Sequence, residues 1–322
     1  MKVAKLYRYP VKSMGGECVK KAMVTPIGIA GDRQYAIIDV ETGHIASAKS
    51  PRKWGNMLRF SARYLEEPGL DGSAAAIEIC FPDGSRMSSE HPSIDAKLSK
   101  AFGRQLRLSY QLRDRPHSEL IWRVVEGQEA TEWTERRKVR IDGADDVILF
   151  ELGGAVPKLE GHHNFLDLAP VHVLTTSTLR QLSYLSNGLD FNHRRYRPNI
   201  LLDTTQNGFV EQEWINKTLS FEKLAMIALM PTPRCVMTTL AQDNLPVSRL
   251  TLRSIVRHNT LELDQMPGRW ACAGIYANPC QFGELSVDDQ VKVTSSSPLV
   301  LQAMKDSWAA ASASPRAGQM AM

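Results

Sequence analysis

The sequence has 322 residues, of which 43% are hydrophobic and 23% are charged. These are the values of an ordinary globular protein with one large domain or two smaller ones, and they exclude a disordered or fibrous chain. The formal net charge of +4 is small for this length, which argues against a dedicated nucleic-acid-binding protein with a concentrated basic stripe.

Five cysteines are spaced irregularly, and no two of them form a C-x-x-C pair. A structural zinc site, a thioredoxin-like motif and a plant-type iron–sulfur centre all need spacings that are absent. Residues 1–5 lack the apolar core of a signal peptide, and no apolar run approaches the roughly 20 residues of a membrane span. We therefore expect a cytoplasmic protein without an iron–sulfur cluster, a membrane attachment or a nucleic-acid partner.

The first hundred residues predict short strands that are separated by tight turns. The strands are expected at residues 3–9, 34–39 and 75–81. Pro82-Asp83-Gly84 is typical of a hairpin turn, because proline and glycine supply the required backbone angles. A short helix is expected over residues 94–102, with Ser93 and Gly103 as its caps.

Residues 113–161 are polar and show little periodicity, which predicts long loops and the passage between two domains. Beyond them, a helix is expected after the hydroxyl-rich run Thr175-Thr176-Ser177-Thr178, and it would end at Asn187-Gly188. Further strands are expected at residues 170–174, 199–203, 218–224, 225–230, 273–277 and 291–293. Residues 298–313 predict a last amphipathic helix, followed by a disordered tail at 314–322.

Strands thus dominate the prediction, and no alternation of strands and helices indicates a doubly wound sheet. The fold class that suits this pattern is mainly β, with a closed or half-closed barrel. We expect a β-rich N-terminal domain at residues 1–112, a second domain at 113–297 and a C-terminal helix and tail at 298–322.

The turn over residues 231–239 carries the most reactive candidate. An apolar strand is expected to stop at Pro231 and Pro233, because proline cannot donate to a sheet ladder. The turn then presents Arg234 and Cys235, and a neighbouring cation favours the nucleophilic, metal-binding thiolate. Taken alone, Cys235 is more typical of a small buried residue.

Four separated segments carry a resemblance to a known family. They are Tyr9-Pro10-Val11-Lys12-Ser13, Gly31-Asp32-Arg33-Gln34-Tyr35, Arg195-Tyr196-Arg197-Pro198-Asn199-Ile200, and Arg234-Cys235-Val236-Met237-Thr238-Thr239, the last followed by Thr251-Leu252-Arg253 and Gly274-Ile275-Tyr276. In this order they resemble MOSC-domain proteins with an N-terminal MOSC β-barrel, relatives of the C-terminal domain of molybdenum cofactor sulfurase and of the mitochondrial amidoxime reducing component. The resemblance spans residues 1 to about 293 and implies a β-barrel MOSC domain with few helices after a barrel-like N-terminal domain.

The resemblance also implies a molybdenum–pyranopterin cofactor. The residues that would line its pocket are Lys12, Ser13, Arg33, Arg197 and Arg234, with Thr175, Thr176 and Asn199 as polar neighbours. Arginine suits such a ligand because its guanidinium forks onto phosphate oxygens, although each arginine taken singly is more typical of a surface ion pair. Cys235 matches the metal-ligating cysteine of the family, and Tyr276 matches a position near the cofactor or else is a core aromatic.

The implied activity is the reduction of N-hydroxylated or S-oxidised small molecules by oxygen-atom transfer. Electrons would come from a separate ferredoxin-, cytochrome- or flavin-type protein. The alternatives are a carrier of the cofactor or of sulfur, and an enzyme of specialised metabolism with other sulfur or nitrogen chemistry. The histidines at 162, 163 and 172 are of a residue type that can ligate a metal. We do not expect them to do so, since the family does not use a histidine ligand. Ala241-Gln242-Asp243-Asn244 departs from the family's acidic stretch, so the substrate rim is expected to differ.

Overall fold

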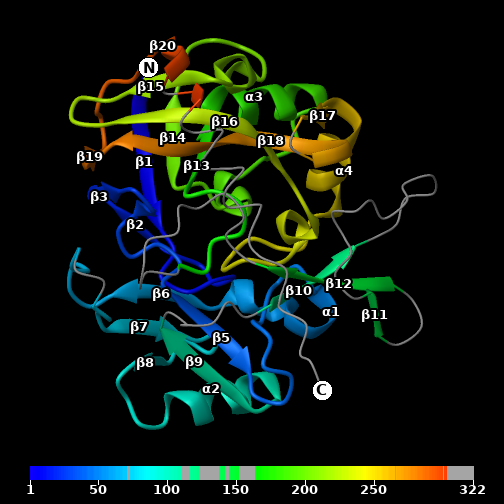
Figure 1. Ribbon diagram of the computed structural model, residues 1–322. Helices are drawn as coiled ribbons and strands as arrows, with labels where there is room; N and C mark the ends of the chain where they lie inside the picture. The colour runs from blue at the N-terminus through cyan, green and yellow to red at the C-terminus, as the bar shows by residue number, and fades with distance from the viewer. Residues whose placement is uncertain are drawn as a thin grey trace, which may run out of the picture.

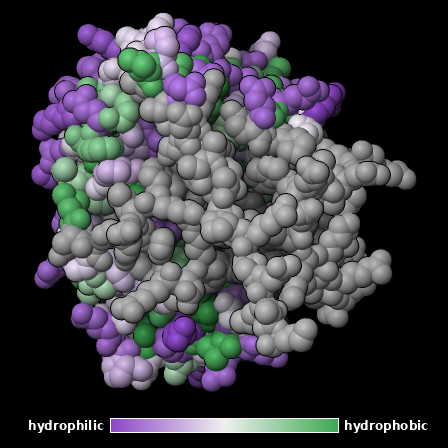
Figure 2. Space-filling view, in the orientation of Figure 1, coloured by the Kyte–Doolittle hydropathy of each residue, from purple (hydrophilic) through white to green (hydrophobic). Residues whose placement is uncertain are grey.

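The computed structural model describes residues 1–70, 73–110, 117–122, 138–141, 145–151, 164–264, 266–299 and 301–302. Strands dominate these residues and helices are short, so the expected mainly β fold is confirmed. Two β-rich units lie one above the other in Figure 1, with the first and last strands of the chain together in the upper unit. Hydrophilic side chains dominate the described part of the face shown in Figure 2.

The upper unit is built on a nine-stranded sheet whose main path is β2-β1-β14-β13-β18-β16-β15-β20, with β17 paired to β18. Its strands are β1 (Lys2–Arg8), β2 (Glu17–Val19), β13 (Val171–Thr175), β14 (Ile200–Asp203), β15 (Lys217–Ser220), β16 (Ala225–Pro233), β17 (Thr260–Leu263), β18 (Met266–Gln281) and β20 (Lys292–Ser295). Beside it lies a three-stranded sheet of β3 (Lys21–Thr25), β4 (Gly28–Ile29) and β19 (Gly283–Ser286).

Along the chain, the helices of the upper unit come between its strands. They are α3 (Thr176–Leu185) and α4 (Arg249–His258), with the one-turn 3-10 helices η3 (His193–Tyr196), η4 (Val210–Trp214) and η5 (Val236–Thr239). The Oγ1 atom of Thr175 accepts a hydrogen bond from the backbone N–H of Thr178, so the hydroxyl-rich run begins α3 as expected. Among the described residues, no helix has both the length and the apolar character that a membrane crossing needs.

The lower unit holds the remaining described strands of the first 110 residues. These are β5 (Tyr35–Asp39) with β9 (Leu106–Tyr110), and β6 (Ser61–Tyr64), β7 (Ile77–Cys80) and β8 (Arg86–Ser88), accompanied by α1 (Pro51–Trp54), η1 (Gly55–Arg59) and α2 (Ile94–Phe102). The helix α2 has the expected bounds and ends at Gly103, whose positive φ of 64° closes it.

The first strands of the chain belong to the core of the upper unit. Buried Val3 and Leu6 of β1 pack in one cluster with Val173 of β13 and Ile275 of β18. The lower unit has its own cluster, which includes Ile37, Trp54 and Leu98 and which begins in the chain at Val11. The chain therefore passes between the two cores within a few residues of β1. The predicted domain limits at residues 112 and 297 stay predictions.

Several elements differ from the sequence expectation. The strand β16 continues past Met230 to Pro233, because the pairing of β16 with β18 is irregular on both sides of Pro231 and a proline fits where the ladder is interrupted. The segment 113–161 contains the sheet of β10 (His117–Trp122), β11 (Lys138–Ile141) and β12 (Asp145–Glu151) in place of loops alone. The strand expected at 218–224 ends at Ser220.

Several other elements, among them α4 and β17, were not expected from the sequence. The last helix is helical at 298–299 and 301–302, and its continuation and the tail at 314–322 lie outside the described residues.

Replacing Leu6 with alanine tests whether β1 supports the upper unit. Leu6 is fully buried, so Leu6→Ala is expected to lower the free energy of unfolding by about 2–5 kcal/mol. Leu65→Ala, at a side chain that is 48% exposed, is the matched control and is expected to change the free energy little. Urea denaturation followed by circular dichroism measures both. Equal stability of the two variants would contradict the placement of β1 in the core.

Candidate functional site

The candidate site lies where the chain passes between the two units. After β1, the backbone runs beside the segment after β4: the N–H of Arg33 donates to Tyr9 O at 2.7 Å, and the N–H of Tyr35 donates to Pro10 O at 2.9 Å. Lys12 closes the pairing by donating its N–H to Tyr35 O at 2.8 Å. The first two segments of the family resemblance, distant by about twenty residues in the sequence, are therefore neighbours.

Three predicted site residues have left-handed backbone conformations. Ser13, Arg33 and Arg197 have φ angles of 63°, 51° and 53°. The other four described non-glycine residues with positive φ are all asparagine or aspartate, which tolerate this region, whereas arginine gains nothing locally from it. Such a conformation costs on the order of 1 kcal/mol or more for a residue of this type, and strained residues cluster at functional sites.

Arg33 and Arg197 both lie against the ring of Tyr9. Their guanidinium carbons are 4.8 Å and 4.2 Å from the ring centroid, a distance at which the aromatic face attracts a cation. Tyr9 is held by its own hydrogen bonds, from its hydroxyl to Pro198 O at 3.1 Å and from its N–H to Asp32 Oδ1 at 2.8 Å. Arg33 is paired with Asp32. The ring and the carboxylate thus hold two arginines together that would otherwise repel each other.

Arg197 has a buried donor without a partner. One of its terminal nitrogens, Nη1, donates to the carbonyl of Met14, while Nη2 is buried and makes no hydrogen bond. Burial and the neighbouring Arg33 charge lower the pKa of Arg197 to about 10, which still leaves it cationic at neutral pH. An unsatisfied charged donor at a buried position is costly, and an anion would satisfy it.

Arg234 also has a buried donor without a partner. Its Nη2 donates to Tyr196 O at 2.6 Å, its Nη1 lies 3.4 Å from Nε2 of His172, and its Nε is buried without a partner. Burial, with the Arg234 charge as a second cause, lowers the pKa of His172 well below its usual value, so its imidazole is neutral near pH 7. A neutral ring can accept from Arg234, and the guanidinium keeps a donor to offer a ligand.

Lys12 and Lys49 share the carboxylate of Asp167. Their Nζ atoms lie 2.6 Å and 2.9 Å from its oxygens, and Lys12 also donates to Phe165 O at 3.1 Å. Burial lowers the pKa of Lys12 to about 8, against the opposing effect of Asp167. Burial also acts on Asp167, yet the two lysines hold the pKa of its carboxyl far below the usual value.

Cys235 lies at the entry of η5, partly buried, directly after Arg234. Burial lowers the pKa of Lys49, but the Asp167 carboxylate, with smaller contributions from Cys235 and Tyr276, raises it above the usual value. Lys49 is therefore within electrostatic reach of both residues. Burial also raises the pKa of Tyr276, so its phenol stays protonated and remains a hydrogen-bond donor. The ring of Tyr276 meets that of His172 edge to face at 5.9 Å.

Two family models match this sequence. Residues 1–99 match the MOSC N-terminal beta barrel domain, and residues 160–292 match the MOSC domain. The chain belongs to the MOSC-domain proteins. Domains of this kind are associated with the binding of molybdenum cofactor.

Comparison with individual proteins adds little to this assignment. No curated protein matches the sequence significantly. Among solved structures, the crystal structure of APC1665, the YUAD protein from Bacillus subtilis, is similar with 9% identity over 92% of this chain and 96% of that chain, at a TM-score of 0.43.

Charge interactions, direct or through Lys49, Asp167 and Tyr9, link six predicted residues of this MOSC protein, and the side chains of the other four make hydrogen bonds to other segments. The gathered residues are Lys12, Arg33, Arg197, Arg234, Cys235 and Tyr276. We call Lys12, Arg33, Lys49, Arg197 and Arg234 the cation cluster. Ser13 accepts a hydrogen bond from the N–H of Ala48 at 3.2 Å. The side chain of Asn199 bridges the N–H of His172 and the carbonyl of Tyr7, which fixes the junction of three strands.

Thr175 and Thr176 lie at the start of α3. Their hydroxyls donate to Glu211 at 2.7 Å and to Asp203 at 3.0 Å, contacts that join α3 to neighbouring elements. Their predicted roles as polar neighbours of a cofactor stay predictions, as do those of Ser13 and Asn199. The histidines at 162 and 163 lie outside the described residues.

Sequence reasoning missed Lys49, Asp167 and Tyr9 as members of the site. Tyr9 stands in the same segment as Lys12, and Asp167 is an isolated acid among apolar residues, which is a usable signal for a buried ion pair. Lys49 has no such signal, because its partner comes from a distant segment.

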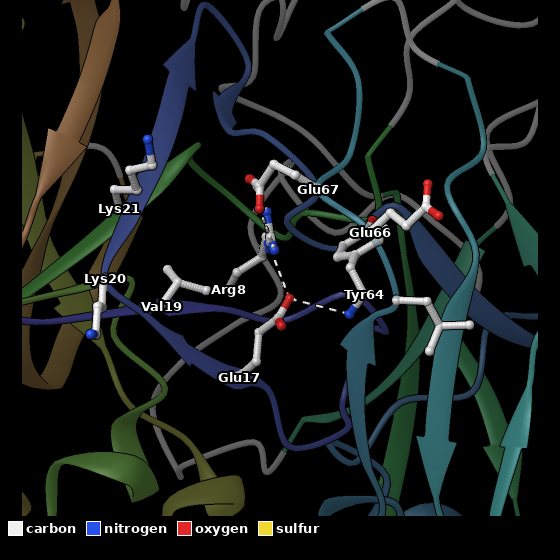
Figure 3. A pocket seen from close by; sticks show the side chains of 9 residues that line it. Arg8, Glu17, Val19, Lys20, Lys21, Tyr64, Glu66 and Glu67 are labelled. Carbon is white, nitrogen blue, oxygen red and sulfur yellow. Dashed lines mark hydrogen bonds and ion pairs between the residues drawn. The ribbon is translucent and has the colours of Figure 1, made fainter.

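A separate open groove of about 340 Å³ lies elsewhere in the MOSC protein (Figure 3). Arg8 lies at its centre and donates to Glu17 at 2.8 Å and to Glu67 at 2.7 Å, above the ring of Tyr64. The cation at its centre, Arg8, is already paired with these two carboxylates. The groove is thus a weaker candidate for ligand binding than the cation cluster, which has buried donors without partners.

The pKa of Lys12 predicts that anion binding at the cation cluster depends on pH. Lys12 loses its proton above about pH 8, so the affinity for sulfate is expected to fall as the pH rises from 7 to 9.5, by up to tenfold per pH unit above 8. Sulfate is the suitable probe because its own charge is constant in this range. Lys12→Arg keeps its charge and should remove the fall. Titration calorimetry measures both proteins, and an affinity that is independent of pH in the wild type would contradict the assignment.

Proposed function

We propose that this MOSC protein binds a molybdenum–pyranopterin cofactor at the cation cluster and acts as an oxidoreductase on N-hydroxylated or S-oxidised small molecules. The observation that carries the proposal is the pair of buried, unpartnered donors, Nη2 of Arg197 and Nε of Arg234. Donors of this kind fit a ligand that is rich in phosphate and ring acceptors. The protein would be cytoplasmic and would receive electrons from a separate carrier protein.

Each residue of the site has a distinct part in this proposal. Lys12, Arg33 and Arg197 would hold the phosphate of the cofactor, since all three are cationic at neutral pH and converge on Tyr9 or Asp167. Cys235 would ligate the metal, because a soft thiolate suits a metal that already has dithiolene sulfur ligands. When bound, the cofactor supplies two-electron redox chemistry that no protein side chain offers.

Proton supply would come from the protein side of the site. Reduction of an N–OH bond consumes two electrons and two protons and yields the N–H product and water. Lys49 interacts electrostatically with both Cys235 and Tyr276, so the candidate donors are its protonated Nζ and the phenol of Tyr276. Both keep their protons at neutral pH, so they would orient the substrate oxygen and donate to it as the N–O bond breaks.

Cysteine variants test the reaction and the metal ligand together. Cys235→Ser replaces a soft thiolate with a hydroxyl that stays protonated, so turnover of a model N-hydroxy compound per bound molybdenum is expected to fall at least a hundredfold. Serine variants of Cys18, Cys80, Cys272 and Cys280 are the matched controls and should keep turnover. Because Cys272 is buried, Cys272→Ser is expected to lower the free energy of unfolding by about 1 kcal/mol.

The outcomes separate the alternatives. Near-wild-type turnover in Cys235→Ser would contradict the assignment of Cys235 as the metal ligand. Wild-type protein that binds the cofactor without any turnover, with a chemical reductant present, would favour a carrier of cofactor or sulfur.

A further inference from the structure

The exposed face of α4 carries a row of arginines. Arg249, Arg253 and Arg257 are all exposed and are four residues apart, so they lie along one side of the helix. The helix contains no acidic residue, and no ion pair joins these arginines to a carboxylate within the described parts of the chain. Leu250 and Val256 lie among them and are 55% and 56% exposed.

Arg257 lies in the last turn of α4, where the helix dipole favours a cation, but the other two arginines of the row do not stabilise the helix. Like charges four residues apart destabilise a helix by about 0.2–0.5 kcal/mol per pair. Arg249 also lies in the first turn, where the helix dipole disfavours a cation and favours an acid. The helix α2 follows the usual rule, with Asp95 in its first turn and Lys100 in its last. Arg249 and Arg253 therefore need an explanation outside the helix.

The buried face of α4 contacts the turn that holds Cys235. The hydroxyl of Thr251 lies 3.3 Å from the carbonyl of Thr238, and the hydroxyl of Thr238 donates to the carbonyl of Cys235 at 3.0 Å. At the start of the helix, the N–H of Ser248 donates to Thr239 O at 2.9 Å. Figure 1 shows α4 at the outside of the upper unit, beside β17 and β18. The arginine row is thus about one helix diameter, roughly 10 Å, from the turn.

We propose that the exposed face of α4 is the docking surface for a small acidic electron-carrier protein. This inference rests on the proposed function, in which each turnover needs two electrons from outside the chain. The carrier delivers them in succession from an iron–sulfur cluster or a flavin, which is oxidised, and the substrate N–O bond is reduced with two protons from the site. A carrier that docks on α4 brings its redox centre close to Cys235.

The composition of the face favours a protein partner over nucleic acid. Arginine and exposed apolar side chains together are typical of the centre of a protein interface, where charge complementarity sets the orientation and the rate of association. A nucleic-acid surface would extend the positive field over a wider area, whereas the net charge of this chain is only +4.

Charge reversal on α4 tests the docking surface. The probes are a purified acidic [2Fe–2S] ferredoxin and an acidic flavodoxin, with the basic cytochrome c as the control carrier and a short DNA duplex as the alternative ligand. The variant R249E/R253E/R257E is compared with R59E/K100E/R107E, which makes the same change of charge at exposed positions of the lower unit. Circular dichroism confirms that both variants are folded.

Calorimetric titration of the full-length protein at low salt gives the result. We expect one acidic carrier to bind the wild type and the lower-unit variant with similar affinity. Its affinity for the α4 variant should be at least tenfold lower, and its affinity for the wild type should fall as the salt concentration rises. Binding of neither acidic carrier, equal binding to both variants, or tighter binding of cytochrome c or of DNA would overturn the proposal. Molybdenum content of the same samples separates the two proposals: its absence would refute the proposed function, and a failure of docking with molybdenum present would refute only the surface.

Discussion

The confinement of several cations in one buried place is the constraint on which the site depends. Arg33 and Arg197 lie against one tyrosine ring, and Lys12 and Lys49 share one carboxylate. Two carboxylates, Asp32 and Asp167, face this group, so positive charge is in excess. A buried excess of charge lowers stability unless a counter-ion arrives. A bound anion is therefore expected to raise the stability of the folded protein.

The connection of the two units explains how this charge is brought together. The strand β1 belongs to the upper core, and the residues directly after it enter the lower core at Val11 and Met14. The chain then returns, and β3 pairs with β19 near the end of the sequence. The segment of Arg33 likewise connects β4 of the upper unit to β5 of the lower unit, so it is fixed at both ends and keeps its strained backbone angle. The same packing places the turn of Cys235 beside α4.

Local signals in the sequence predicted the elements that depend on local chemistry. The helix α2 was predicted with its observed bounds because Gly103 closes it, and α3 was predicted from its hydroxyl cap. The helix α4 was missed because its polar, arginine-rich face masks an inner face that buries little more than Thr251 and Ile255. The end of β16 was placed too early, since a proline stops a strand only where the ladder is regular.

The site residues divide in the same way, into those that a local segment reveals and those that only the folded chain brings together. Residues within recognisable segments, such as Lys12 and Arg234, were found, whereas Lys49 and Asp167 make a contact that only the folded chain creates. Sequence also assigned Asn199 by its segment, although its side chain is occupied in joining strands. Segment matches identify which residues belong to the family, and the hydrogen bonds of each side chain determine which of them are available to a ligand.

The most direct measurement compares cofactor content with stability in Arg197→Met. Protein is produced in a host that makes molybdenum cofactor, and molybdenum and released pterin fluorescence are determined per chain. The account predicts about one molybdenum per chain in the wild type. In Arg197→Met, content should fall at least tenfold while the metal-free protein is as stable as the wild type or more so, because a buried cation with one unsatisfied donor has been removed. Full cofactor content in the variant, or wild-type protein without molybdenum and pterin, would contradict the account.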